Sequence, residues 1–190
     1  MTINLSNTKR VQISDLIQST IQSNSLTVRD IAIVVGTLIA SFPAVEYGLL
    51  FHRELEILKI NALKRHYNFE LPISLNTACI DQLNWWLLEG LTSENVIFHG
   101  NPIFFVQSDS SGFAWGALRL DQINKKTQGI WDGYEAQHDI NILETKACLL
   151  GVMALCNDIL DCHLQVQIDN TTAVTYINNM GGVHTSGCNT

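Results

Sequence analysis

The stretch IFFVQSDSSGFAWGALRL, residues 103–120, decides the expected fold class. Its first four residues, 103–106, form an uninterrupted apolar run that is typical of a buried strand. Asp109, two serines and Gly112 then supply the residue types of a tight turn. Residues 113–120 are again mostly apolar, with small residues inserted, and indicate a second strand. The stretch therefore predicts two strands joined by a short turn, the beginning of an antiparallel meander.

The residues that follow extend this meander into a mixed sheet. Residues 129–134 predict a third strand, residues 141–160 predict a long amphipathic helix, and residues 163–168 predict a fourth strand. A further helix is expected from residue 169 to 179, ended by Gly181-Gly182. A strand–helix–strand crossover implies one parallel pairing in an otherwise antiparallel sheet. The predicted fold class of this part is therefore α/β, with a mixed sheet and a crossover helix.

The preceding part of the chain predicts an α-helical segment. Apolar residues recur at helical spacing in four stretches, and Thr27 with Asp30 has the spacing of a capping box. The expected helices cover residues 11–23, 27–42, 46–66 and 76–91. Residues 92–102 contain Gly, Asn, Pro, Ser and Thr and predict a linker. We therefore expect a helical domain at 1–91, a linker at 92–102 and a sheet domain at 103–190.

The charge of the chain argues against one class of function. The net charge is −7, made of 7 basic and 9 acidic residues in 1–102 and 4 basic and 9 acidic residues in 103–190. Binding of nucleic acid through a basic patch depends on Lys and Arg. A free-standing protein that holds nucleic acid in this way is therefore not expected, and the acidic second part instead suggests solvated surface or a cation site.

Cysteine usage and hydropathy indicate an intracellular protein without a membrane span. The five cysteines are odd in number and include no C-x-x-C pair, so neither a disulfide framework nor a zinc site is expected. The first ten residues lack the apolar core of a signal peptide. The apolar stretch 31–42 is much shorter than the ~20 residues that span a bilayer. A cytoplasmic or nuclear location is expected.

Three carboxylates are placed at predicted element ends. Asp109 follows the first strand, Glu144 lies in the first turn of the long helix, and Asp169 ends the fourth strand. Each has an ordinary alternative: Asp109 can open a turn, Glu144 can be the N3 partner of an Asn141 cap, and Asp169 can cap the last helix. If the first and fourth strands are neighbours, the three converge. Converging carboxylates repel one another unless they bind a hard cation, so the pattern predicts an Mg²⁺ site.

Several segments resemble a known family. The ribonuclease H domain of reverse transcriptases resembles three segments of the chain: SDSSGFAWGAL (108–118), INILETKA (140–147) and IDNTTAVTYINNMGG (168–182). Their sequences are most similar to those of the DIRS group of tyrosine-recombinase retroelements. Upstream, VRDIAIVVGTLIASFPAVEYGLLFHRELE (28–56) and LNWWLL (83–88) resemble the thumb and connection region that precedes this domain. The order Asp, Glu, Asp fits ribonuclease H, whereas a transposase or integrase of the same fold has its Glu last. An actin-like ATPase would require glycine-rich phosphate loops.

The resemblance implies an activity and a site. The first three catalytic carboxylates of the family correspond to Asp109, Glu144 and Asp169. Together these carboxylates would bind two Mg²⁺ (or Mn²⁺) ions. With the ions bound, the domain would hydrolyse the RNA strand of RNA–DNA hybrids. The implied partners are the hybrid and the rest of the reverse transcriptase polyprotein, with no membrane.

The chain also departs from the family. The fingers and palm, with their paired aspartates, have no counterpart here, and neither does the fourth acidic residue that follows the Gly-Gly. His184 is not expected to replace this acid. We therefore expect a C-terminally incomplete, truncated ribonuclease H-like domain with weakened activity. The alternative is a catalytically inactive retroelement remnant or a nucleic-acid-binding scaffold domain.

Overall fold

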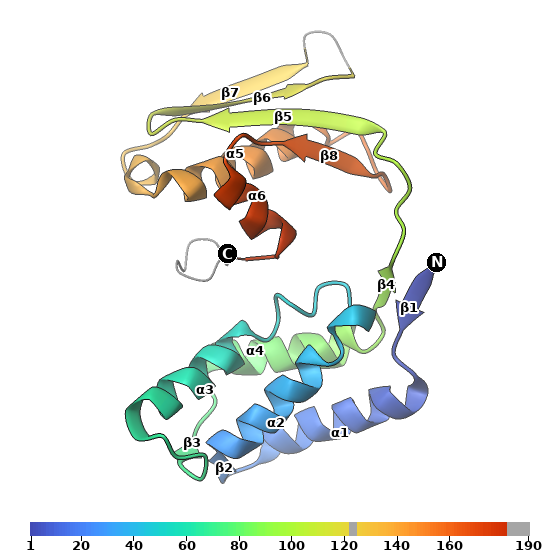
Figure 1. Ribbon diagram of the computed structural model, residues 1–190, viewed down its shortest axis with the longest axis vertical. Helices are drawn as coiled ribbons and strands as arrows, with labels where there is room; N and C mark the ends of the chain where they lie inside the picture. The colour runs from blue at the N-terminus through green and yellow to red at the C-terminus, as the bar shows by residue number, and fades with distance from the viewer. Residues whose placement is uncertain (122–124, 182–190) are drawn as a thin grey trace. The chain divides into compact units, whose positions relative to one another are not determined.

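The computed structural model describes residues 1–121 and 125–181, and its contacts divide the chain into two compact units, Met1–Phe98 and His99–Thr190 (Figure 1). The boundary between the units falls inside the stretch 92–102. The expectations for Gly182 and His184 lie outside the described residues.

The first unit is mainly helical, with two short antiparallel strand pairs at its ends. Strand β1 (Thr2–Asn4) pairs with β4 (Glu94–Val96), and β2 (Leu26–Thr27) pairs with β3 (Pro72–Ile73). Strand β4 lies in the segment expected to be a linker, so that segment is not a loop throughout. The helices are α1 (Asn7–Gln22), α2 (Val28–Ile39), α3 (Arg53–His66) and α4 (Thr77–Trp85). A short 3₁₀ helix, η1 (Phe42–Ala44), follows α2, and a π-helical segment, η2 (Trp86–Gly90), continues α4.

The capping box predicted at the start of α2 is confirmed. The Thr27 side chain accepts a hydrogen bond from the Asp30 amide, and the Asp30 carboxylate accepts one from the Thr27 amide at 2.8 Å. These bonds satisfy two amides that a helix start otherwise leaves without partners. The apolar face of α2 lies in the core of the unit, with Ile31, Val34 and Leu38 fully buried.

The prediction of a helix over 46–66 is wrong in its first third, because α3 begins at Arg53. The preceding residues form successive turns, with backbone hydrogen bonds from Gly48 to Val45 and from Phe51 to Gly48. The buried Trp86 lies against these turns, and its indole N–H donates to the Phe51 carbonyl oxygen at 2.8 Å. This tertiary contact supplies the partner that a helical backbone would have supplied.

The second unit is a mixed α/β unit built on one four-stranded sheet. The strands are β5 (Phe104–Ser110), β6 (Ala114–Arg119), β7 (Lys126–Ile130) and β8 (Leu164–Gln167), and the helices are α5 (Ile140–Leu155), α6 (Thr171–Asn178) and the short 3₁₀ turn η3 (Glu135–Gln137). The strand order is β7-β6-β5-β8, and only β5 and β8 are parallel. The predicted parallel pairing through a crossover helix is therefore present.

Three boundaries in this unit differ from the predictions. Strand β5 continues to Ser110, so Asp109 lies within the strand and not past its end. Strand β7 covers 126–130 in place of 129–134, because its backbone pairs with that of β6 up to Ala114. Helix α5 ends at Leu155 and not at residue 160. For the two strands, pairing with the backbone of β6 determines where the element ends.

Helix α5 packs closely against one face of the sheet, and α6 lies on the same side (Figure 1). Val106, Ala117 and Leu155 form one buried cluster beneath the helix. Gly151 makes the close approach possible, since a Cβ atom built there would lie 2.5 Å from the Ala117 Cβ. Among the described residues no helix covers the opposite face of the sheet. Within 1–121 and 125–181, no helix is both long and apolar enough to cross a membrane.

Candidate metal centre

The three carboxylates singled out in the sequence lie together in the structure. Asp109 is in β5, Glu144 is in α5, and Asp169 lies between β8 and α6. One oxygen from each carboxylate lies within 4.8 Å of the other two. Asp109 and Asp169 are exposed, whereas Glu144 is only 3% exposed. In the described part of the chain this is the single group of His, Cys, Asp and Glu residues with such spacing.

The sheet topology explains why the two aspartates meet. Because β5 and β8 are parallel neighbours, their C-terminal ends lie at the same edge of the sheet. Asp109 is near the end of β5, and Asp169 follows β8 by two residues. A hydrogen bond of 2.9 Å from the Asn170 side-chain amide to the Asn141 side-chain oxygen joins the start of α6 to the start of α5. This bond holds the segment with Asp169 beside the helix that contains Glu144.

Glu144 has one satisfied and one unsatisfied carboxylate oxygen. Its Oε1 accepts a hydrogen bond from the Ser110 amide at 3.2 Å, and the same amide donates to Asp109 Oδ1 at 2.9 Å. The second oxygen, Oε2, is buried and has no hydrogen-bond partner in the structure. A buried carboxylate oxygen without a partner is costly unless a cation or a proton is bound to it.

Burial raises the pKa of the Glu144 carboxyl above its ordinary value, because the charged form loses its hydration. The negative charges of Asp109 and Asp169 raise the pKa further, and the hydrogen bond from the Ser110 amide partly opposes the rise. All these contributions except that hydrogen bond disfavour an ionised Glu144. A divalent cation between the three groups would reverse this preference by favouring the ionised form.

The ordinary alternatives for the three residues are not what the structure shows. The N-cap of α5 is Asp139, which accepts from the Asn141 amide at 2.9 Å, so Glu144 is not the N3 partner of an Asn141 cap. The N-cap of α6 is Asn170, whose side chain accepts from the Ala173 amide at 3.0 Å. The turn after β5 is closed by Ser111, whose hydroxyl accepts from the Ala114 amide. None of the three carboxylates has a capping or turn-closing role in these places.

No protein-family model matches the chain, and no curated protein matches it. The chemistry that the site can support is therefore inferred from its own ligand atoms.

Three carboxylates without a nearby His or Cys ligand are typical of sites for hard divalent cations such as Mg²⁺, Mn²⁺ or Ca²⁺. The buried, unpartnered Oε2 of Glu144 fits such an ion, because a bound cation would offset the cost of leaving this oxygen without a hydrogen bond.

The segment that follows β7 contacts the end of β5 next to the site, and the sequence did not predict this contact. The indole N–H of the buried Trp131 donates to the Ser111 carbonyl oxygen at 3.0 Å and lies 3.3 Å from the Ser110 hydroxyl. Lys146 lies over the Trp131 ring, with its ammonium 5.9 Å from the ring centre, and forms an ion pair with Glu135. These contacts fix the position of the Ser110 amide, which binds both Asp109 and Glu144. A Trp in a predicted strand gave no indication of this role.

Proposed function

We propose that the second unit is a ribonuclease H-like, metal-dependent nuclease that hydrolyses the RNA strand of RNA–DNA hybrids. The support is the strand order β7-β6-β5-β8 with α5 as crossover, the order Asp, Glu, Asp along the chain, and the resemblance of the segments around them to the ribonuclease H domain of reverse transcriptases. By the same resemblance, the first unit is a thumb and connection-like segment of a reverse transcriptase polyprotein, with its substrate in the cytoplasm or nucleus.

One observation carries the proposal. Three carboxylates from three different elements have oxygens within 4.8 Å of one another, and the buried one has an oxygen with no partner. Such an arrangement is destabilising in itself, since like charges at this spacing repel and burial removes hydration. Structures retain such local cost mainly where function requires it. Cation binding is the function that relieves it.

In this proposal Asp109, Glu144 and Asp169 bind Mg²⁺ or Mn²⁺. Divalent ions bound to such carboxylates lower the pKa of a water nucleophile and stabilise the charge on the leaving oxygen of a phosphodiester. The protein's own contribution is positioning. The Ser110 amide orients two of the carboxylates, and the hydrogen bond between Asn141 and Asn170 places the third.

The test is cleavage of a fluorescently labelled RNA–DNA hybrid by the whole chain in Mg²⁺ and in Mn²⁺, with double-stranded RNA and double-stranded DNA as competing substrates. We expect weak cleavage of the RNA strand of the hybrid, abolished by Glu144→Gln. The matched control is Asp161→Asn, because Asp161 is an exposed acid outside the site and its φ of 51° is one that Asn readily adopts. Hybrid binding without any cleavage in either ion would contradict the proposed hydrolysis and favour a binding domain.

A further inference from the structure

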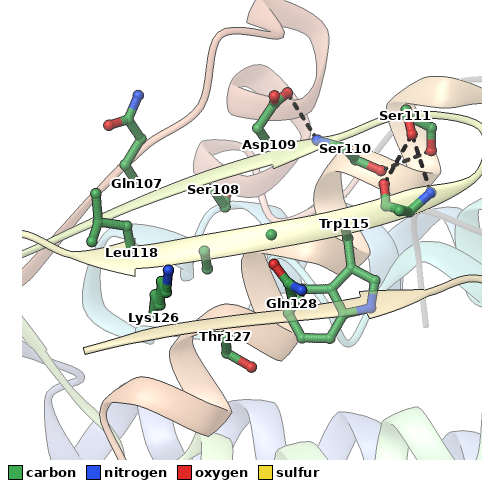
Figure 2. A pocket seen from close by; sticks show the side chains of 13 residues that line it. Gln107, Ser108, Asp109, Ser110, Ser111, Trp115, Leu118, Lys126, Thr127 and Gln128 are labelled. Carbon is green, nitrogen blue, oxygen red and sulfur yellow. Dashed lines mark hydrogen bonds between the residues drawn. The ribbon is translucent and has the colours of Figure 1, made fainter. Parts of the chain in front are cut away.

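The open face of the sheet, opposite α5, contains a hollow that ends at the metal centre. The hollow has a volume of about 470 Å³ and is lined by residues of β5, β6 and β7, including Asp109 (Figure 2). In Figure 2 Asp109 and Gln107 project from β5 to one side of the sheet, whereas Ser108 projects to the other side. The hollow therefore belongs to the face that no described helix covers.

The register of the strands shows what forms the hollow. Asp109 of β5 lies opposite Gly116 of β6, and Gly116 lies opposite Gln128 of β7. In the next row on this face, Gln107 lies opposite Leu118, which lies opposite Lys126. Gly116 leaves the middle of the first row without a side chain, between a carboxylate on one side and an amide on the other.

The basic side chains of the second unit differ in whether they are already paired with an acidic residue. Residues 99–190 contain four Lys and Arg residues, and three of them form ion pairs within the unit. Arg119 pairs with Asp121 and Asp158, Lys125 with Asp158, and Lys146 with Glu135.

Lys126 is exposed, and in the part of the chain that the structure describes it has no ion-pair partner. Among the Lys and Arg residues of this unit that the structure describes, the one without an ion-pair partner therefore lines the hollow that leads to Asp109.

We propose that this hollow binds the sugar–phosphate backbone of the strand that is cleaved, with Lys126 contacting a phosphate and Gln107 and Gln128 contacting backbone oxygens. The inference rests on the proposed function and adds to it a surface that binds the cleaved strand. This surface is the hollow, and we call it the strand-binding track. An anionic polymer held at the metal centre must continue past Asp109, and the hollow offers room, a positive charge and amides. Amide side chains both donate to phosphate oxygens and accept from 2′-hydroxyls, the groups by which RNA backbones are recognised.

The test measures equilibrium binding of a labelled RNA–DNA hybrid to the whole chain by fluorescence anisotropy, with Ca²⁺ in place of Mg²⁺ so that binding is read without turnover. Lys126→Gln should weaken binding by roughly threefold to tenfold and lower the slope of log Kd against log salt by about one. Lys125→Gln is the matched control, because it removes the same charge one residue away from a side chain that is already paired with Asp158 at 2.8 Å.

A second variant tests the shape of the hollow without changing charge. A Cβ atom at position 116 would meet no atom nearer than the Thr127 carbonyl oxygen, at 3.8 Å, so Gly116→Ile fills the hollow and places a good strand-forming residue in β6. It should weaken hybrid binding while the stabilisation of the chain by Mg²⁺ remains. Wild-type binding by both Lys126→Gln and Gly116→Ile, or no difference between Lys126→Gln and Lys125→Gln, would overturn the proposed track. If Glu144→Gln still abolished cleavage in that case, the nuclease proposal would stand without it.

Discussion

The side-chain amide of Asn170 donates a hydrogen bond of 2.9 Å to the side-chain oxygen of Asn141. Asn170 is also the N-cap of α6, and Asn141 lies in the first turn of α5. One bond thus fixes the distance between two helix starts, and with it the distance between Asp169 and Glu144.

Two substitutions at position 170 separate the roles of this residue. Asn170→Ser keeps a side chain that caps helices well but removes the amide that reaches Asn141, whereas Asn170→Ala removes both interactions. We expect both variants to bind Mg²⁺ more weakly, and only Asn170→Ala to lose a further ~1 kcal/mol of unfolding free energy from the cap. Isothermal titration with Mg²⁺ and urea unfolding measure the two effects. Wild-type Mg²⁺ affinity in Asn170→Ser would show that the link does not position the carboxylates.

Mg²⁺ should stabilise the chain through Asp109. A ligand that binds only the folded state, present at 100 times its Kd, raises the unfolding free energy by about 2.7 kcal/mol. Asp109→Asn removes one of three charges that attract the ion and should abolish most of the Mg²⁺-dependent rise in Tm. Asp161→Asn should retain the full rise, because Asp161 lies outside the site. An undiminished response in Asp109→Asn would place the bound ion elsewhere on the chain.

The raised pKa of Glu144 predicts a pH dependence of stability in the absence of divalent ions. The folded chain holds a proton on Glu144 at pH values where the unfolded chain has already released it. The unfolding free energy contributed by this residue therefore falls as pH rises from the ordinary Glu pKa through the raised value, and remains low above that window.

Glu144→Gln cannot titrate, so the comparison with wild type isolates this effect from that of the other acids. With EDTA present, the variant should become more stable than wild type as pH increases through the window. With Mg²⁺ the order should reverse, because only wild type presents the third carboxylate. Equal pH profiles of the two proteins in EDTA would mean that the buried carboxylate carries no penalty.

The contact between Gly151 and Ala117 predicts that the effect of Gly151→Ala on the unfolding free energy changes sign when Ala117 is replaced by Gly. Gly151→Ala gains helix propensity of up to about 1 kcal/mol, but its new Cβ would lie 2.5 Å from the Ala117 Cβ. Overpacking of this kind typically costs about 1–3 kcal/mol, so the single variant should be destabilised. In an Ala117→Gly background the clash is absent, and the same substitution should stabilise the chain. Urea unfolding of the four proteins forms a double-mutant cycle, and additive effects would refute the contact.

The sequence was informative where the outcome depends on local spacing or on the order of elements along the chain. The Thr27 and Asp30 capping box needs only a spacing of three, and the structure has it. The convergence of Asp109, Glu144 and Asp169 followed from their positions at element ends together with one parallel strand pair.

Features that depend on distant contacts were missed. The turns before α3 contact Trp86, whose indole N–H donates to the Phe51 carbonyl oxygen 35 residues earlier. The hydrogen bond from the Asn170 side chain to the Asn141 side chain joins two residues that are ordinary helix-start types when each is considered alone. The sequence also does not show that Oε2 of Glu144 lacks a hydrogen-bond partner, because this results from burial of the side chain in the folded chain.

The parallel pairing of β5 with β8 also has a consequence for the kinetics of folding. It places Phe104 beside Leu164, sixty positions along the chain, whereas β5, β6 and β7 pair with their neighbours in sequence. Closing so long a loop costs chain entropy before it yields contacts, so β8 should join the sheet late. The carboxylates of Asp109 and Asp169 then meet only near the end of folding. In stopped-flow experiments Mg²⁺ should therefore slow unfolding and leave the rate of folding nearly unchanged. A bound cation would thus prolong the lifetime of the folded unit without guiding its formation.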